Sequence, residues 1–297
     1  MVSLASTAAM VSSLKSAQDV TFSSYFLRPG PVENALFAAA ARRREHVHVR
    51  LEGTLYRGSG EMAPENRYAL ERLHALRADV RLVHRSDADG PGLHIKAAVC
   101  DGVAFLDDRN WNVNGDTVVR DDTPSHVRAI RDAILHREAD PVRGLALSKW
   151  DALDAEAHVL RAAAHAREVD VETEYLGGSL VSKALRELRA KGVRTRVIVS
   201  EQAYKEDRTT TRVAAKSLAA SGVDVRIARA SEKIAVAGTR AWIGSANATS
   251  TYQSANAVEW SLSTSDKRVV HALQQRFNAR WREATPVHAP STARVRS

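Results

Sequence analysis

Apolar and polar positions along the chain follow one order of elements, and that order occurs twice. Residues 35–52 and 159–176 each show an Ala-rich helical stretch that runs into an alternating strand. Residues 69–83 and 184–199 each place apolar side chains three and four positions apart and then change to strand alternation. The first spacing predicts an amphipathic helix and the second a strand, because their periods are about 3.6 and 2 residues.

A hairpin follows in each copy. Residues 93–110 and 231–247 are apolar runs around a glycine-containing turn, which is Asp-Gly in the first copy and Gly-Thr in the second. Asp-Gly is a strong hairpin signal and Gly-Thr is a weaker one. We expect a helix after each hairpin, at 124–137 and 266–283, and an additional strand in the second copy over 222–229.

This order of elements predicts the fold class. Strands that alternate with helices favour an α/β sandwich with a mainly parallel sheet. Two copies of roughly 120 to 140 residues are typical of a duplicated domain rather than a solenoid. We therefore expect two repeats, packed as a pseudo-dimer. Their expected limits are an N-terminal extension at 1–30, a first repeat at 31–145, a second repeat at 146–285 and a flexible tail at 286–297.

Composition narrows the partners. The chain has 297 residues, a formal net charge of +8 and 44% hydrophobic residues, enough for a substantial core. The positive charge favours anionic partners such as nucleic acid, phospholipid head groups or phosphate esters, although a solvated basic surface is the plain alternative. No stretch reaches the roughly 18 apolar residues of a membrane span, so none is predicted. The single cysteine, Cys100, suits a cytoplasmic location and is expected to be a small buried side chain.

Candidate chemistry gathers in the two hairpins. Strand alternation places His94 and Lys96 on one face, and Asp101 follows in the turn. Lys233 stands in the second copy where Lys96 stands in the first. The run Gly-Ser-Ala-Asn at 244–247 ends the second hairpin, with Asn247 in the place that Asn110 has in the first. If the repeats pack about a twofold axis, these donors, with the backbone at Gly244 and Ser245, converge on a pocket suited to phosphate.

Each of these residues also has a purely structural interpretation. A histidine in a strand is usually a structural residue, and a lone lysine is usually exposed. An aspartate in an Asp-Gly turn is favoured for local reasons, and so is an asparagine after Gly-Ser. The matching positions in two copies favour the functional interpretation for His94, Lys96, Lys233 and Asn247, and leave Asp101 open.

The pattern H-x-K-x4-D, followed by a G-S-x-N run in a duplicated frame, resembles the phospholipase D superfamily over roughly residues 31 to 285. The resemblance implies metal-independent phosphodiester chemistry without a cofactor. In that family a histidine attacks phosphorus and forms a phosphohistidine, and a second histidine protonates the leaving oxygen. The resemblance implies that His94 is the nucleophile, that Lys96, Asp101 and Lys233 complete the catalytic set, and that Asn110, Ser245 and Asn247 hold the phosphate.

The sequence departs from the family pattern in three places. Ser231 stands where the second histidine is expected, and Gly238 where the second aspartate is expected. The first G-S-x-N run is replaced by residues 107–110, Asp-Asp-Arg-Asn, which puts a carboxylate at Asp108 unless Arg109 or Lys96 pairs with it. A serine hydroxyl is far too weak an acid to replace an imidazolium.

Three consequences remain open. His94 could work without its general acid on substrates whose leaving group needs little protonation, two chains could pair their His94 residues, or the pocket could only bind phosphate. We rank the first ahead of the third. The expected activity is hydrolysis or phosphatidyl transfer at a phosphodiester, with phospholipid as substrate and peripheral membrane contact. The alternatives are a nuclease and a pseudoenzyme that binds anionic lipid or nucleic acid.

Overall fold

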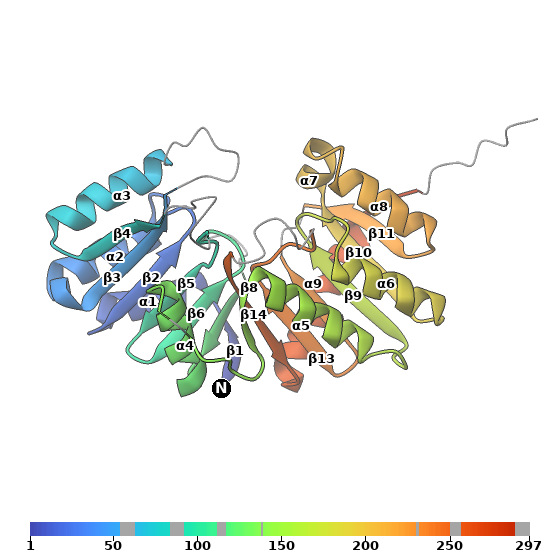
Figure 1. Ribbon diagram of the computed structural model, residues 1–297, viewed down its shortest axis with the longest axis horizontal. Helices are drawn as coiled ribbons and strands as arrows, with labels where there is room; N and C mark the ends of the chain where they lie inside the picture. The colour runs from blue at the N-terminus through green and yellow to red at the C-terminus, as the bar shows by residue number, and fades with distance from the viewer. Residues whose placement is uncertain are drawn as a thin grey trace, which may run out of the picture. The chain divides into compact units, whose positions relative to one another are not determined.

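The computed structural model describes residues 1–53, 63–83, 92–111, 117–137, 139–229, 232–249 and 257–288, and the chain folds into two compact units (Figure 1). The first unit contains Met1–Ala152 together with Gly244–Ala246 and Tyr252–Leu262. The second unit contains Leu153–Ile243, Asn247–Thr251 and Ser263–Ser297. Two short segments of the second repeat therefore belong to the first unit.

The first unit is built on a mixed sheet with the strand order β1-β7-β6-β5-β2-β3-β4. The neighbours β2, β3 and β4 are parallel, and the remaining pairs are antiparallel. The strands are β1 (Val2–Ala5), β2 (Val20–Ser24), β3 (Val47–Glu52), β4 (Asp79–Val83), β5 (Ala97–Cys100), β6 (Val103–Asp107) and β7 (Val118–Asp121).

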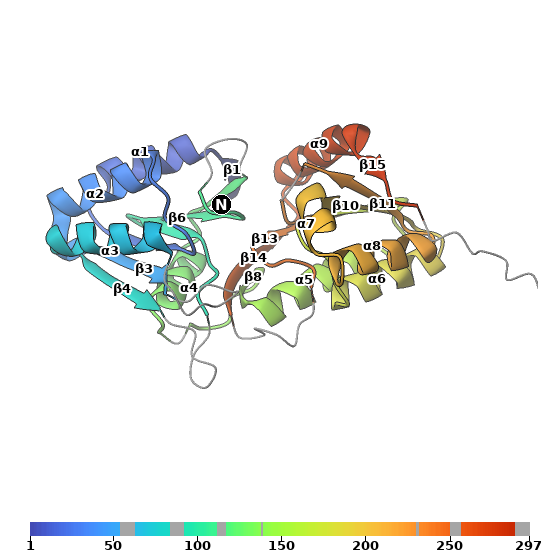
Figure 2. The same ribbon diagram turned by 90° about the horizontal axis from the view of Figure 1, so that it is seen from above.

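Helices cover both faces of this sheet, as Figure 2 shows. They are α1 (Thr7–Ser16), α2 (Pro31–Arg43), the short 3-10 helix η1 (Arg44–His46), α3 (Pro64–Ala75) and α4 (Pro124–Ile134). Helices α1, α2 and α3 lie on one face, and α4 lies on the other against β2, β5 and β6. Apolar side chains of α1, α2 and α3 pack on those of β2, β3 and β5, among them Met10, Leu14, Leu36, Leu73, Phe22, Val49 and Ala98.

The second sheet has the order β15-β11-β10-β9-β12-β13, followed by β14 and β8. The strands are β8 (Leu145–Ser148), β9 (Glu168–Thr173), β10 (Arg194–Ser200), β11 (Asp224–Ala228), β12 (Ile234–Ala237), β13 (Arg240–Gly244), β14 (Val258–Thr264) and β15 (Thr285–Pro286). The helices are α5 (Lys149–Arg161), α6 (Leu180–Ala190), α7 (Glu201–Glu206), α8 (Thr211–Ala220) and α9 (Lys267–Glu283). Strands β9, β10 and β11 are parallel. The pairs of β15 with β11, β12 with β9, β12 with β13 and β14 with β8 are antiparallel. Both sheets are therefore mixed rather than mainly parallel as expected, because the hairpins and the short edge strands add antiparallel pairs.

The strand orders revise the internal alignment of the sequence. The run β6-β5-β2-β3-β4 matches β13-β12-β9-β10-β11, so β11 is the counterpart of β4 and is not an additional strand. The helix and strand that begin the first copy are α1 and β2, and both lie inside the expected N-terminal extension 1–30. Helix α1 buries Thr7, Met10 and Leu14 through a Ser- and Ala-rich sequence with weak helical periodicity, which explains why the pattern did not reveal it.

The other elements lie close to their expected positions. Both hairpins form, as β5–β6 and β12–β13, and both following helices form, as α4 and α9. The expected tail at 286–297 begins inside a short pairing of β15 with β11, and residues 289–297 lie outside the described residues. Cys100 is 4% exposed, and burial raises the pKa of its thiol to about 12. Among the described residues, no helix combines the length and apolarity that a membrane crossing requires.

Candidate active site

The segment that carries His94 and Lys96 comes just before the β5 ladder and is fixed by its backbone. The N–H of Leu93 donates to Oε2 of Glu52 at 2.7 Å, and the N–H of His94 donates to the carbonyl of Val258 at 2.9 Å. The carbonyl of Lys96 accepts from the N–H of Asp107 at 2.9 Å. The chain is therefore held on both sides at the place where the two predicted side chains stand, all within the first unit.

His94 pairs with a carboxylate that the sequence analysis did not identify. Its Nδ1 lies 2.8 Å from Oε1 and 2.9 Å from Oε2 of Glu259, on β14. The side chain of Glu259 is 3% exposed, and that of His94 is 18% exposed. The hydroxyl of Ser245 donates to Oε2 of Glu259 at 2.5 Å and accepts the N–H of Trp260 at 3.0 Å. A buried chain of polar contacts thus fixes the imidazole.

The electrostatics of Glu259 favour its charged form. Burial alone would raise the pKa of this carboxyl group, but the charges of His94 and Lys96 and the hydrogen bonds from His94 and Ser245 lower it below its ordinary value. Glu259 is therefore an anion over the neutral pH range. An anion beside Nδ1 fixes the proton on that nitrogen, so that the basic lone pair of the neutral ring is on Nε2.

Lys96 is nearly fully buried, with 1% of its surface exposed. Its ammonium lies 5.7 Å from the centroid of the Tyr25 ring, in the loop after β2. The ring of Tyr25 also meets the imidazole of His94 edge-on, with the centroids 5.3 Å apart. Tyr25 thus contacts both members of the predicted pair. A buried cation next to a histidine is a charge arrangement suited to a phosphate oxygen.

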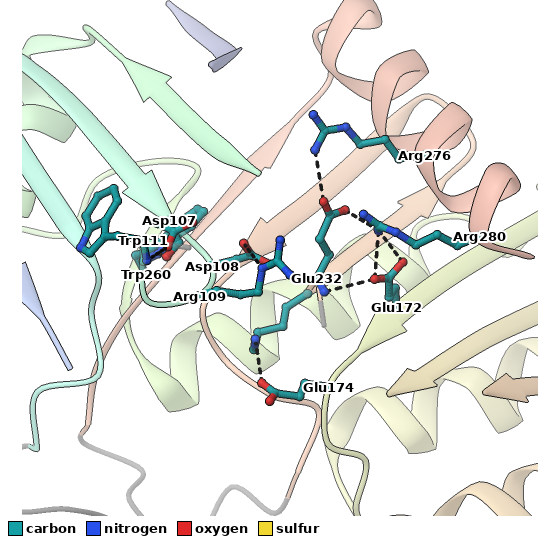
Figure 3. Close-up of polar contacts among 11 residues, drawn as sticks. Asp107, Asp108, Arg109, Trp111, Glu172, Glu174, Glu232, Trp260, Arg276 and Arg280 are labelled. Carbon is teal, nitrogen blue, oxygen red and sulfur yellow. Dashed lines mark hydrogen bonds and ion pairs between the residues drawn. The ribbon is translucent and has the colours of Figure 1, made fainter. Parts of the chain in front are cut away.

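The end of β6 carries the predicted residue Asn110 within a mostly buried polar turn. Asp107 accepts the N–H of Trp111 on Oδ2 at 2.6 Å, and its carbonyl accepts the indole N–H of Trp260 at 2.8 Å (Figure 3). The buried carboxylate of Asp108 forms an ion pair with Nε of Arg109 at 3.9 Å, and Arg109 is one of the two partners expected from the sequence. Trp111 has a left-handed backbone with φ of 57°.

Asp101 lies at the far end of β5 from Lys96. In the β5–β6 turn its φ is 46°, and the following Gly102 has a φ of 85°. Its carboxylate accepts the backbone N–H groups of Gln18 and Asp19 at 2.8 to 3.0 Å. These contacts join the end of α1 to the hairpin and are structural. In the other hairpin Gly238 has the same left-handed turn conformation, with a φ of 63°.

In the second unit the structure places Lys233 and Asn247 in contacts of their own. Nζ of Lys233, which is 2% exposed, lies 3.2 Å from Oε2 of Glu174. Oδ1 of Asn247 accepts the N–H of Tyr175 at 3.1 Å. Ser231, the position of the lost histidine, lies outside the described residues. Whether these residues serve the same site as His94 stays a prediction.

A buried cluster of ion pairs in the second unit includes Glu232, the residue before Lys233 (Figure 3). Arg280 on α9 contacts Glu172 at 2.8 Å and Glu232 at 2.7 Å, and Arg276 contacts Glu232 at 3.1 Å. Both glutamates are at most 1% exposed. Burial raises the pKa of Glu172 to about 7, against the lowering effect of Arg280. The cluster packs α9 onto the sheet with charges.

Comparison with known proteins gives the class of fold first. The polyphosphate kinase of Porphyromonas gingivalis is similar with a TM-score of 0.70 at 16% identity, over 97% of this chain and 48% of that chain. A variant of the yeast tyrosyl-DNA phosphodiesterase is similar with a TM-score of 0.53 at 11% identity, over 90% of each chain. The chain spans about half the length of the kinase. At these identities the structures establish a shared two-repeat α/β fold and nothing about the reaction.

The family match is more specific. Residues 158–281 match the family described as the cardiolipin synthase, PLD-like domain. The search of the curated proteins found no match. The match and the fold together confirm the resemblance to the phospholipase D superfamily, which includes phosphodiesterases, nucleases and kinases.

Proposed function

We propose that the chain is a metal-independent phosphodiesterase that hydrolyses or transfers a phosphoryl group through a phosphohistidine on His94. The observation that carries the proposal is the His94–Glu259 pair, supported by Ser245 and bordered by the buried Lys96. A neutral imidazole with one nitrogen held by a carboxylate is the arrangement that a nucleophilic histidine needs.

In the first step, the lone pair of Nε2 of His94 attacks phosphorus, and the bond to the leaving oxygen breaks. Glu259 accepts the Nδ1–H and stabilises the positive charge that develops on the ring. The Lys96 ammonium stabilises the nonbridging oxygens. Water or an alcohol then attacks phosphorus and loses its proton to solvent, the P–N bond breaks, and the electron pair of that bond returns to Nε2 of the neutral His94.

The leaving group decides how fast the first step is. The family's second histidine is replaced by Ser231, and a serine cannot protonate an oxygen near neutral pH. We therefore propose that the chain prefers leaving groups of low pKa, which depart without a proton. In this role Ser245 positions Glu259 rather than holding phosphate, because its hydroxyl donates to that carboxylate.

We propose phospholipid as the substrate class. The matched family is described as a cardiolipin synthase domain, and the net charge of +8 suits an anionic lipid surface. A nuclease is the alternative within the same chemistry. The ion pair of Lys233 with Glu174 favours a second candidate, a pseudoenzyme that only binds phosphate groups, because half of the expected charge set is engaged by a carboxylate.

The first test is turnover of bis(p-nitrophenyl) phosphate in EDTA, because nitrophenolate leaves without a proton. The wild-type chain should turn the diester over and His94→Ala should lose at least about 10³-fold in kcat. His271→Ala, on the exposed face of α9, is the matched control and should keep full activity. An inert wild type with an intact circular dichroism spectrum would contradict the catalytic proposal and favour the pseudoenzyme.

The substrate class needs its own comparison. Vesicles of phosphatidylglycerol and a single-stranded oligonucleotide are offered separately to wild type and His94→Ala. Release of the lipid head group that depends on His94 supports the phospholipid proposal. Cleavage of the oligonucleotide alone would assign the nuclease alternative.

A further inference from the structure

A cavity of about 120 Å³ lies beside the predicted residue Asn110 in the first unit. Its lining includes Arg28, Gly30, Pro31, Asn110 and Trp111. The volume exceeds what a single water molecule needs several times over. The residues come from two places, the start of α2 and the turn after β6.

The first wall of the cavity is the N-terminus of α2, a helix of 13 residues. Gly30 is its N-cap and Pro31 its first residue, and in the described part of the chain no side chain caps it. A Cβ built on Gly30 would meet nothing within 4 Å, so the approach to the backbone is open. The first N–H groups of a helix and its dipole together attract an anion. Pro31 has no N–H, so the donors of this terminus are the N–H groups of the residues that follow it.

The second wall carries one donor and one acceptor without a partner among the described residues. Trp111 is 5% exposed, and its indole N–H is buried with no hydrogen-bond partner among the described residues. The ring is held by stacking on Phe22, with centroids 5.6 Å apart. The amide oxygen of Asn110 is also buried without a partner among the described residues. Because an amide can be turned over without changing its shape, Asn110 can equally present its NH2 group.

Charge near the cavity favours an anion at its mouth. Arg28 is exposed and lines the cavity, with its guanidinium 5.9 Å from the ring of Phe26. Three acidic groups stand nearby in the sequence. The carboxylate of Asp107 is engaged by the N–H of Trp111, and that of Asp108 forms an ion pair with Arg109. Glu33 has a buried carboxyl group whose pKa is raised by burial. None of the three lines the cavity.

We propose that this cavity binds a phosphate group, in addition to the one that reacts at His94. The helix N-terminus, the indole N–H of Trp111, the amide of Asn110 and Arg28 provide the donors. A series of ring contacts links it to the nucleophile: Phe26 packs on Tyr25 at 4.6 Å, and Tyr25 packs on His94 at 5.3 Å. The group is either a second phosphoryl group of the substrate, which rests on the proposed function, or free inorganic phosphate.

The first experiment measures binding without catalysis. Inorganic phosphate is titrated into the full-length His94→Ala chain at pH 7, and tryptophan emission is recorded, since Trp111 lines the cavity. Trp111→Phe, which keeps the stacking ring, should abolish the phosphate-dependent change. Arg28→Ala should weaken binding roughly fivefold. The matched controls are Trp150→Phe and Arg208→Ala, both at exposed positions, and they should match the parent.

An emission change that persists in Trp111→Phe, or equal affinity in Arg28→Ala and Arg208→Ala, overturns the proposal. The absence of any phosphate-dependent change in the parent also overturns it. These outcomes do not depend on turnover, so they are distinct from a failure of the proposed function. Circular dichroism of each variant establishes that the fold is retained.

The second experiment separates the two sources of phosphate. Two substrates are compared, thymidine 5′-(4-nitrophenyl phosphate) with and without a 3′-phosphate. If the cavity takes a second phosphoryl group of the substrate, Arg28→Ala raises KM roughly tenfold for the 3′-phosphorylated compound and less than about twofold for the other. Equal effects on both compounds, with phosphate binding retained in the first experiment, assign free phosphate as the ligand. If the wild type turns over neither compound, the binding experiment alone decides the cavity, and turnover of bis(p-nitrophenyl) phosphate decides the proposed function.

Discussion

The two halves of the chain place their motif lysines in different surroundings. Lys96 lies against the ring of Tyr25, next to the His94–Glu259 pair, and its charge acts on the carboxylate of Glu259. Lys233 instead lies 3.2 Å from the carboxylate of Glu174. Glu259 pairs with a histidine, whereas Glu174 forms its ion pair with the lysine itself. The same scaffold therefore places one lysine beside a histidine–glutamate pair and the other in a direct ion pair.

Tyr25 and Glu174 are equivalent positions because the surrounding hydrogen bonds repeat. In each half, the hydroxyl of the last strand residue donates to the backbone carbonyl two residues later in the chain. The N–H of the residue after that carbonyl donates to a side chain from a helix. The pairs are Ser24 with Phe26 and Thr173 with Tyr175, then Leu27 with Asn66 and Leu176 with Thr211. The comparison is therefore between matched sites.

The two halves also differ at a second set of buried positions, which are Ser23 and Ile95 in the first half and Glu172 and Glu232 in the second. In the first half the hydroxyl of Ser23 donates to the carbonyl of the buried Ile95. In the second half Glu172 and Glu232 occupy these places and are bound by Arg280. The second half thus uses ions for packing where the first uses an apolar side chain. We infer that the second half supports the fold and that chemistry is concentrated in the first.

The largest expected effect on activity comes from removing the charge beside His94. Glu259→Gln keeps the shape but no longer stabilises positive charge on the imidazole. We expect kcat for bis(p-nitrophenyl) phosphate to fall about 10²- to 10³-fold, equivalent to about 3 to 4 kcal/mol. Steady-state kinetics across pH 5 to 9 measures it, because a positioning role also changes the pH profile.

Glu187→Gln provides the matched control for this change. Glu187 forms an exposed ion pair with Arg161 on the second unit, so its neutralisation should leave kcat unchanged. Ser245→Ala should cause an intermediate loss, since it removes one donor to Glu259. Full activity in Glu259→Gln would mean that the two halves do not differ in the way proposed.

The next effect concerns stability and the second half. Arg280→Ala leaves two buried carboxylates without their shared cation, and we expect the free energy of unfolding to fall by about 3 to 5 kcal/mol. Urea denaturation followed by circular dichroism gives the value. Arg276→Ala, which removes a partner of Glu232 alone, should cost less. A loss below about 1 kcal/mol for Arg280→Ala would show that the cluster is solvated and does not hold α9.

Sequence patterns predicted the local elements well and the long-range contacts poorly. Both hairpins and the helices after them follow from turn residues and apolar spacing, which act within a few positions. Helix α1 did not, because its small polar residues carry little periodicity and its burial comes from packing on α2. That omission shifted the internal alignment by one helix and one strand.

The same limit applies to the candidate site. His94 and Lys96 are marked by a motif within three residues, so the sequence could propose them as site residues. Glu259 is 165 positions from His94, and nothing in the local sequence connects them. Its one signal was a carboxylate in an apolar stretch, which predicts a buried charge with a partner but does not name the partner. Asp101 shows the reverse, since a motif position is used here for a turn contact.

A smaller expected effect tests the comparison of the two lysines. Glu174→Gln removes the carboxylate that competes with phosphate for Lys233. We expect inorganic phosphate to bind about threefold more tightly to this variant. An ion pair with a partly exposed carboxylate contributes less than about 1 kcal/mol, so its removal changes the binding free energy of phosphate by no more than that amount. Isothermal titration calorimetry on the His94→Ala background measures it, with Glu187→Gln as the control. Weaker binding in Glu174→Gln would show that Glu174 supports the phosphate site.

A further small effect is a pH response in the first half. His126 on α4 pairs with the buried Asp121 at 2.5 Å, whereas α9 begins with the N-cap Asp266. The hydrogen bond from Asp121 raises the pKa of His126 above its ordinary value. The folded state therefore binds this proton more tightly. The stabilisation is complete below the unfolded pKa of about 6.5 and is lost as the pH rises through the higher folded pKa.

His126→Gln isolates this contribution, because Glu172, with a pKa of about 7, also titrates in this range and stays unchanged in the variant. The difference in free energy of unfolding between wild type and His126→Gln should be about 1 kcal/mol larger at pH 5.5 than at pH 8.5. Denaturation curves at the two pH values measure it. A difference that does not change with pH would mean that His126 contributes as a neutral hydrogen-bond partner. The pH response of the chain would then come from the ionic cluster of the second half.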